Sequence, residues 1–159
     1  RVTLIHCRKP DPTPGRGLVR VAPIHQLLAE LRRRRADEAL RLILSDTVEM
    51  VDERVQGSWS GIMASESSIR FHPETLRAAE RRGARFAGAL EHQLEVIHDA
   101  ALAASEPIEL GPGDALFVSN VRALHYRGAC TVQYLEFPRR FEAREIHVLH
   151  LRDEPTWPE

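Results

Sequence analysis

The chain has 159 residues, which corresponds to about one domain. Hydrophobic residues make up 43% of it and charged residues 28%, as in ordinary globular proteins, so wholesale disorder is excluded. With 22 basic and 23 acidic residues the formal net charge is -1, which argues against a dedicated nucleic-acid binder and against a polybasic membrane binder.

The first elements are two short strands separated by a loop. The apolar and β-branched run at residues 2–7 predicts a buried strand, and residues 18–21 predict a second one. Between them, the density of Pro and Gly over residues 9–17 breaks any regular element. Pro23 suits the first position of a helix, because its missing N–H would have no partner there. Apolar residues then recur at helical spacing, at Ile24, Leu27, Leu28 and Leu31.

The middle of the chain is mainly helical. Residues 36–44 predict a second short helix, and interleaved polar and apolar residues over 48–63 predict a pair of short strands. Residues 74–104 are rich in Ala, Leu, Glu and Arg, which predicts a long amphipathic helix interrupted near Gly83. We therefore expect a helical insert over about residues 22–104.

The last third of the chain has the pattern of strands, over about residues 107–151. Pro112 and Gly113 suit the central positions of a tight turn, and residues 115–118 predict a buried strand directly after it. Later strands are expected over 124–127, 131–137 and 144–151. These patterns predict an α+β, β-rich fold, a barrel or jelly roll with helices outside it, in a single domain over residues 1–159.

Several features bear on where the protein works. No stretch approaches the roughly 18 apolar residues of a transmembrane helix, and the first residues lack a signal-peptide pattern. Cys7 and Cys130 make neither a disulfide framework nor a zinc site, so we expect a reducing, cytoplasmic location. The basic residues are arginines except Lys9, a bias typical of GC-rich bacterial genomes. Arg1 leads directly into an apolar run, which favours a processed product or a piece of a longer protein.

The strongest chemical signal lies around His125, one of eight histidines. It follows a predicted strand and turn, and a rigid strand end can hold an imidazole as a metal ligand. The surrounding block carries characteristic residues at fixed offsets, namely Leu110, Pro112, Gly113, Asp114, Asn120, Arg122, Leu124 and Arg127.

This block resembles the late motif of the iron(II)- and 2-oxoglutarate-dependent dioxygenases of the taurine dioxygenase and clavaminate synthase-like superfamily. The resemblance implies a double-stranded β-helix, or jelly roll, in which His125 is the distal ligand of a two-His-one-carboxylate iron site. It implies Fe(II) as cofactor and 2-oxoglutarate as cosubstrate. The implied reaction oxidises a C–H bond of a small molecule and forms succinate and CO₂.

The family also places an arginine on a later strand, where its planar fork binds the distal carboxylate of 2-oxoglutarate. Arg144 matches this position, because it opens a predicted strand with a pattern similar to that of the family. Arg139 and Arg140 are alternatives that lie nearer to His125 along the chain. We expect Arg127 to contact the substrate, an amino acid or another acidic compound.

The resemblance is incomplete upstream. The family carries a His-x-Asp or His-x-Glu far before the distal histidine, and the match here, His72-Pro73-Glu74, opens a helix and lies too near His125. A turn and capping role is expected for it. A loop of paired glycines resembles a family loop that continues into an oxoacid-holding threonine, but Leu18 stands there. We therefore interpret the chain as the C-terminal part of such a dioxygenase, without its N-terminal portion and first metal motif, and inactive in isolation.

Two other hypotheses remain open. The first is a non-catalytic jelly-roll binding domain that has lost the metal site, which Leu18 and the absent His-x-Asp favour. The second is a cupin-like metal enzyme in which His6, His147 or His150 joins His125. In a regular strand His147 and His150 point to opposite sides, so they cannot both face one metal.

Overall fold

The computed structural model describes residues 1–54 and 56–151, and these form two compact units. The strand unit consists of Arg1–Val21 and Glu106–Glu159, and the helical unit is Ala22–Ser105. The assignment of the whole chain to a single domain, with a helical insert over about residues 22–104, stays a prediction.

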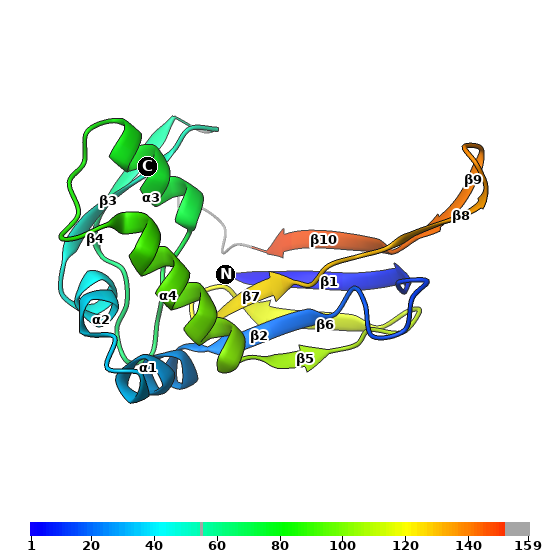
Figure 1. The fold of residues 1–159 in the computed structure, drawn as a ribbon, viewed down its shortest axis with the longest axis horizontal. Helices are drawn as coiled ribbons and strands as arrows, with labels where there is room; N and C mark the ends of the chain where they lie inside the picture. The colour runs from blue at the N-terminus through cyan, green and yellow to red at the C-terminus, as the bar shows by residue number, and fades with distance from the viewer. Residues whose placement is uncertain (55, 152–159) are drawn as a thin grey trace, which may run out of the picture. The chain divides into compact units, whose positions relative to one another are not determined.

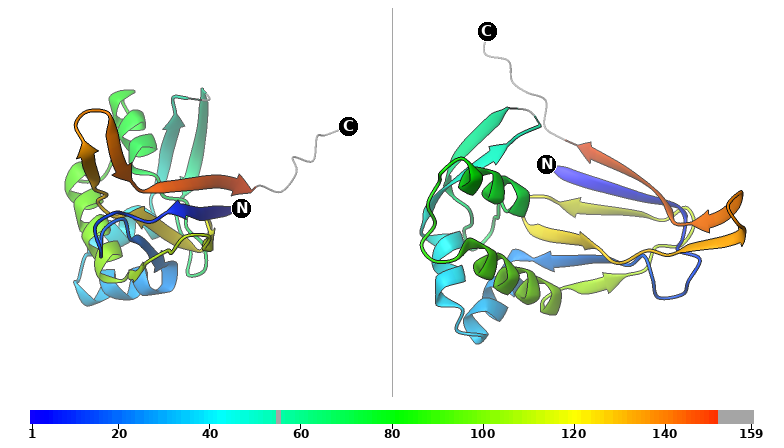
Figure 2. Two further views of the ribbon diagram at one scale, coloured as in Figure 1. Left: turned by 90° about the vertical axis from the view of Figure 1, so that its right-hand side faces the viewer. Right: turned by 45° about the horizontal axis from the view of Figure 1, so that its top comes forward.

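The described residues of the strand unit form these strands: β1 (Val2–Lys9), β2 (Val19–Pro23), β5 (Glu106–Ile108), β6 (Ala115–Ser119), β7 (Ala123–Arg127), β8 (Val132–Glu136), β9 (Arg140–Ala143) and β10 (Glu145–Leu151). They form one sheet in the order β10-β1-β6 and a second in the order β5-β2-β7 (Figure 1). β1 runs antiparallel to both of its neighbours. Among the described strands, β8 and β9 pair only with each other, as a hairpin (Figure 2).

The two sheets of the strand unit share one core. In β1 the side chains of Thr3, Ile5 and Cys7 are buried, and the residues between them are half-buried. This alternation is the one expected of a strand with one face on a core. Members of the core come from both sheets, namely Ile5, Cys7, Val19 and Leu110, with Val21, Ile108, Leu116 and Ile146 packed against them. The predicted β-rich, mixed fold class is confirmed.

The predicted turn between β5 and β6 is confirmed and is tied to β1. The Asp114 N–H donates to the Gly111 carbonyl (3.1 Å), and Gly113 has a φ of 88°, which glycine adopts without strain. The Cys7 N–H donates to the Asp114 carbonyl (2.9 Å), and the Gly113 N–H donates to the Cys7 carbonyl (2.8 Å). These bonds fix the start of β6 against the end of β1.

Three details of the late strands differ from the prediction. β6 is not buried throughout: Val118 faces the core, but Phe117 faces away from it and is 64% exposed. Residues 140–143 form β9, which was not predicted because the segment has no apolar run. This strand is defined by its pairing with β8. Arg144 lies between β9 and β10 and does not open β10.

The described residues of the helical unit form four helices and one strand pair: α1 (Ile24–Arg33), α2 (Asp37–Leu44), β3 (Thr47–Asp52), β4 (Gly57–Ile62), α3 (Pro73–Arg81) and α4 (Leu90–Ala103). Each predicted helix and the strand pair are confirmed, and the long helix is broken into α3 and α4. The break begins after Arg81 and contains Gly83, whose φ is 99°. It is longer than expected, because Phe86 turns onto Val51, Ala78 and Ala79 instead of continuing the helix.

Within the helical unit, α1 and α4 supply much of the apolar interior. α1 buries Ile24, Leu27, Leu28 and Leu31, the residues predicted from their spacing. α4 buries Leu90, Gln93, Leu94, Ile97 and Ala100, and it contacts both α1 and α2. None of the helices in the described part of the chain has the length and hydropathy that a membrane span requires.

Candidate cofactor site

The clearest chemical feature of the strand unit is the side chain of Arg144. Its position between β9 and β10 directs the guanidinium into the protein, where both terminal nitrogens, Nη1 and Nη2, are buried. Neither nitrogen has a hydrogen-bond partner among the described residues. A buried guanidinium without a partner costs of the order of several kcal/mol, so proteins keep such a group where an anion binds.

One wall around Arg144 is the loop that joins β1 to β2. Gly17 is buried in this loop with a φ of 65°. A Cβ atom at this position would lie 2.8 Å from Cδ of Arg144 and 2.9 Å from Cβ of Asp11. The backbone at Gly17 therefore touches the aliphatic part of the Arg144 side chain, and only glycine fits between this side chain and Asp11.

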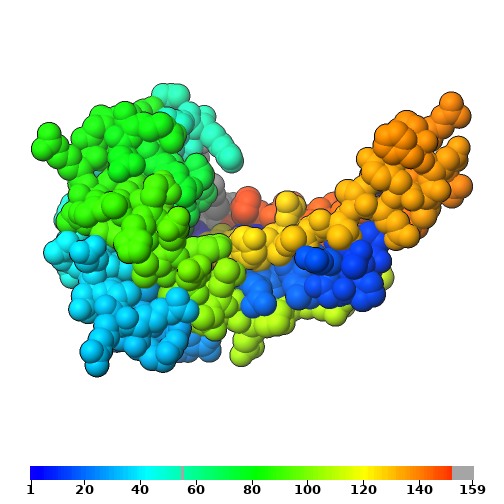
Figure 3. Space-filling view, viewed as in Figure 1, coloured from blue at the N-terminus to red at the C-terminus, as the bar shows by residue number. Residues whose placement is uncertain are grey.

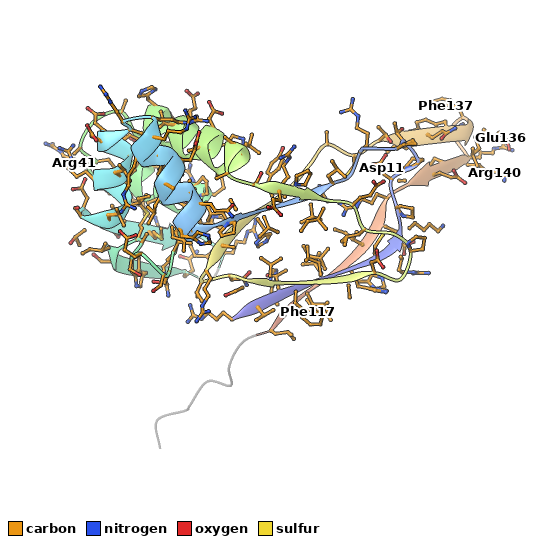
Figure 4. The ribbon with its side chains drawn as sticks, turned by 90° about the horizontal axis from the view of Figure 1, so that it is seen from below. Asp11, Arg41, Phe117, Glu136, Phe137 and Arg140 are labelled. Carbon is orange, nitrogen blue, oxygen red and sulfur yellow. The ribbon has the colours of Figure 1, made fainter. Side chains whose placement is uncertain are left out.

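Asp11 fastens the loop to the segment before β8. Its carboxylate accepts hydrogen bonds from the Thr131 N–H (2.8 Å), the Thr131 hydroxyl and the Thr13 N–H (3.0 Å). Two backbone bonds add to this fastening: the Gly17 N–H donates to the Ala129 carbonyl (2.9 Å), and the Gly128 N–H donates to the Leu18 carbonyl (2.8 Å). Figure 4 shows Asp11 on the side of the unit from which the β8–β9 hairpin extends.

The charge of Arg144 reaches its neighbours although no carboxylate binds it. Burial acts to raise the pKa of Asp11. The hydrogen bonds from Thr131 and Thr13, together with the positive charge of Arg144, lower it by more, so the pKa lies below its ordinary value. Burial raises the pKa of the Cys7 thiol, and Arg144 opposes this rise. The carboxylate oxygens of Asp11 accept hydrogen bonds from the two threonines and not from Arg144. The guanidinium of Arg144 is therefore available to bind a ligand carboxylate.

His125 lies on β7, exposed to solvent. Partial loss of hydration lowers the pKa of His125, and the nearby His150 ring lowers it further. The imidazole is therefore neutral near pH 7, which is the form that binds a metal. The two rings lie close enough for their charges to interact.

The neighbour, His150, is held by a short chain of hydrogen bonds. Thr3 is buried opposite His150 in the β1–β10 register, and its hydroxyl donates to Oδ1 of Asn120 (2.7 Å). The same hydroxyl lies within hydrogen-bond distance of Nδ1 of His150 (3.1 Å). The sequence composition does not predict these hydrogen bonds. The one signal in the sequence is the alternation of β1, which puts Thr3 on the same buried face as Ile5 and Cys7.

The other candidate residues lie elsewhere. His147 pairs with His6 on the opposite face of the sheet, with ring centroids 5.8 Å apart, so His147 and His150 point to opposite sides as predicted. Arg140 is exposed at the end of the β8–β9 hairpin (Figure 4). Arg139, before it in the sequence, and Arg127 on β7 are exposed as well. No group of three His, Cys, Asp or Glu side chains within residues 1–54 and 56–151 is arranged to hold a metal.

The His72-Pro73-Glu74 segment belongs to the helical unit and begins α3, with His72 as the residue before the helix. Thr75 donates to the His72 carbonyl through its hydroxyl (2.8 Å), and Glu74 pairs with Arg77 (2.6 Å). The segment therefore has the helix-starting role expected of it.

Replacing Gly17 by alanine tests the packing of the loop on Arg144. We expect Gly17→Ala to lower the free energy of unfolding by about 1–3 kcal/mol more than Gly15→Ala, because its methyl group clashes with Arg144 and Asp11. Gly15 has a φ of 73° and open space around it, so its variant measures the backbone strain alone. Chemical denaturation of both variants gives the difference, and equal losses would contradict this packing.

The pKa of Asp11 predicts how the loop responds to acid. Its pKa is lowered in the folded chain, so its bonds stabilise the fold above the pKa of an unfolded aspartate, about 3.9, and this stabilisation is lost as pH falls through the folded value. An NMR titration of the Thr131 amide should therefore have a midpoint below about 3.9. Thr131→Val should move the Asp11 midpoint upward. A midpoint at or above the ordinary aspartate pKa in the unmodified chain would contradict the hydrogen bonds that Asp11 accepts from Thr131 and Thr13.

Neither a family model nor a curated protein sequence matches the chain. Several solved structures match it in fold. An asparagine oxygenase in complex with Fe(II), 2S,3S-3-hydroxyasparagine and succinate matches with a TM-score of 0.64 and 16% identity, over 92% of this chain and 44% of that one.

The non-haem iron oxygenase OrfP matches in two structures. A variant in complex with (3S)-hydroxy-L-arginine has a TM-score of 0.55 and 14% identity, over 92% of this chain and 43% of that one. OrfP in complex with Fe has a TM-score of 0.54 and 13% identity, over 92% and 44%. The chain thus spans less than half the length of these proteins. Over that length the chain shares the fold of these oxygenases, which confirms the jelly-roll fold predicted from the sequence.

Proposed function

We propose that the chain is the C-terminal part of an iron(II)- and 2-oxoglutarate-dependent oxygenase that oxidises a small molecule, with an amino acid as the preferred class of substrate. The observation that carries the proposal is the Arg144 guanidinium, whose buried terminal nitrogens have no partner in the described chain. The jelly-roll fold of the matching oxygenases and the late motif around His125 support it independently.

Arg144 suits the distal carboxylate of 2-oxoglutarate. Its planar fork binds a carboxylate through two parallel hydrogen bonds, and burial strengthens these bonds because water is excluded. Arg139 and Arg140 are exposed on the hairpin and offer no such enclosure. We therefore assign the cosubstrate to Arg144, with Gly17 and Asp11 as the residues that shape its surroundings.

The iron site fits the chain only in part. His125 supplies one neutral imidazole, while sites of this kind need two histidines and one carboxylate. Because the described residues hold no suitable group of three, we place the remaining two ligands in a His-x-Asp or His-x-Glu outside this sequence. Iron(II), when bound in such enzymes, supplies the activation of O₂. The chain alone is then inactive.

The substrate class rests on the matching structures and on charge. The asparagine oxygenase and OrfP structures contain hydroxylated amino acids, which are small and zwitterionic. Arg127, two residues after His125 on β7, is exposed, and its permanent charge suits a substrate carboxylate. We keep Arg127 as the substrate-contacting residue and the cytoplasm as the location.

One observation favours the alternative of a non-catalytic jelly-roll binding domain, namely the absence of a three-ligand group among the described residues. The two functions differ in what precedes Arg1 in the gene. A strand ending in His-x-Asp or His-x-Glu in the upstream coding sequence supports the oxygenase. An intact upstream region without this motif supports the binding domain.

Binding of 2-oxoglutarate to this chain tests the role of Arg144. We expect Arg144→Lys to weaken binding about tenfold or more, since lysine loses the bidentate fork. The measurement is an NMR titration of the chain with 2-oxoglutarate, without metal. Arg139→Lys is the matched control and should bind like the unmodified chain. Equal weakening in both variants, or in neither, would remove Arg144 from the site.

An anaerobic titration with iron(II) tests the incomplete metal site. We expect no tight, stoichiometric uptake by the chain, because a single histidine does not hold iron(II) usefully. Calorimetry with His125→Ala beside the unmodified chain makes the comparison. Tight iron(II) uptake that requires His125 would show that this chain carries a complete set of metal ligands, and would contradict the proposal that two ligands lie outside it.

A further inference from the structure

Thr3 is a buried polar residue in a row of apolar ones. It is 0% exposed and shares the core-facing side of β1 with Ile5 and Cys7. A buried hydroxyl costs stability unless it forms hydrogen bonds. The Thr3 hydroxyl donates to Oδ1 of Asn120 (2.7 Å) and lies 3.1 Å from Nδ1 of His150. A polar group in the core of the strand unit therefore holds the His150 ring in one orientation.

His150 lies in the row of β10 side chains that faces the core. Ile146 packs on the core, and His150 shares its face because alternate residues of a strand point the same way. His147 lies on the opposite face of the strand. His150 itself is exposed, so its ring stands where the core-facing row reaches solvent. Because Nδ1 faces Thr3, the other ring nitrogen is the one that can bind a ligand.

His125 lies on the core-facing side of the other sheet. The Gly128 N–H donates to the Leu18 carbonyl (2.8 Å), which sets the antiparallel register of β7 on β2. Continued along the two strands, this register puts His125 opposite Val21, and opposed residues share a face. Val21 packs on the core. The charge of His150 acts on the His125 ring and lowers its pKa, as expected of two rings that face the same interior.

Arg144 and His150 lie at opposite ends of β10. The β8–β9 hairpin extends from one end of the strand unit, as the space-filling view shows (Figure 3). β7 runs toward this hairpin and β10 runs back from it (Figure 1). Arg144 directly follows the hairpin, and His150 comes six residues later, about 20 Å away along an extended strand. A 2-oxoglutarate molecule bound to Arg144 therefore does not reach His150.

We infer that His150 contacts the substrate of the oxygenase, on the side of His125 that lies away from Arg144. The inference rests on the proposed function, because it needs a metal on His125 and the cosubstrate on Arg144. Asn120 precedes β7 and is linked through Thr3 to His150. His125 follows on β7, and the hairpin and Arg144 come after it. The cosubstrate occupies the Arg144 side of His125, so the His150 side is left for the substrate.

An imidazole suits an amino acid as its ligand. The ring nitrogen that Thr3 does not hold accepts a hydrogen bond from an ammonium or amide N–H, or donates one to a carboxylate, according to the tautomer. An amino acid carries groups of both kinds. Because Thr3 and Asn120 fix the ring, binding costs little side-chain entropy at His150. His150 thereby contributes to the choice of substrate.

NMR titrations of the chain with L-asparagine and with L-arginine, an uncharged and a cationic amino acid, test this inference in the presence of 2-oxoglutarate. We expect at least one of them to shift the ring signals of His150 and to leave those of His147 unchanged. His150→Phe should weaken this binding about tenfold or more, because phenylalanine keeps a ring but lacks both nitrogens.

His147→Phe is the matched control for this titration. His147 lies on the opposite face of the same strand, beside His6, so its variant should bind the amino acid like the unmodified chain. Equal loss in His147→Phe and His150→Phe overturns the inference. It is also overturned if neither amino acid binds the unmodified chain at up to about 20 mM.

Thr3→Val tests whether the buried hydroxyl positions the ring. Valine keeps the shape of threonine and removes the hydrogen bonds to Asn120 and His150, so amino-acid binding should weaken about threefold or more. An unchanged affinity would show that the ring acts without this support and would overturn the role given to Thr3.

Binding of 2-oxoglutarate separates this inference from the assignment of Arg144. His150→Phe should bind 2-oxoglutarate like the unmodified chain, since the two residues lie at opposite ends of β10. If His150→Phe loses the oxoacid as well, the substrate position is wrong. If Arg144→Lys leaves 2-oxoglutarate binding unchanged while His150→Phe weakens amino-acid binding, the cosubstrate assignment fails and the role of His150 stands.

Discussion

The unpaired guanidinium of Arg144 is the constraint around which the strand unit is organised. The terminal nitrogens are buried and have no hydrogen-bond partner in the described chain, so the fold carries a buried charge at a cost in stability. Gly17 lets the backbone approach the Arg144 side chain, and Asp11 holds the loop in place through Thr131 and Thr13. The carboxylate of Asp11 lies near Arg144 but bonds to Thr131 and Thr13, so it leaves the guanidinium of Arg144 without a partner.

The register of β1 with its two neighbours explains how distant residues reach one site. Thr3 lies opposite His150 on one side and Val118 on the other, so three strands place their side chains on one face. The hydroxyl of Thr3 then links Oδ1 of Asn120 to Nδ1 of His150 by hydrogen bonds. A shift of the register by one residue would turn all of these groups to the opposite face.

One stretch of about twenty residues joins His125 to Arg144 in the strand unit. At its start His125 is exposed on β7, and at its end the terminal nitrogens of Arg144 are buried. Between them lies the β8–β9 hairpin, in which Tyr134, Phe137 and Phe141 are exposed. The two residues singled out by the resemblance therefore differ in their access to solvent although they are close in the sequence.

The sequence alone determined the order and type of most elements, since periodicity, Pro and Gly decide local structure over short distances. It correctly placed a helix that carries Ile24, Leu27, Leu28 and Leu31, and the turn before β6. The late motif singled out His125, and the pattern of the last strand singled out Arg144. It did not predict β9, the exposure of Phe117 or the clamp of Asp11 on Thr131, because each depends on residues far away in the chain. Only the tertiary structure decides which side chains are buried without a partner, since burial is a property of the packed fold and not of local sequence.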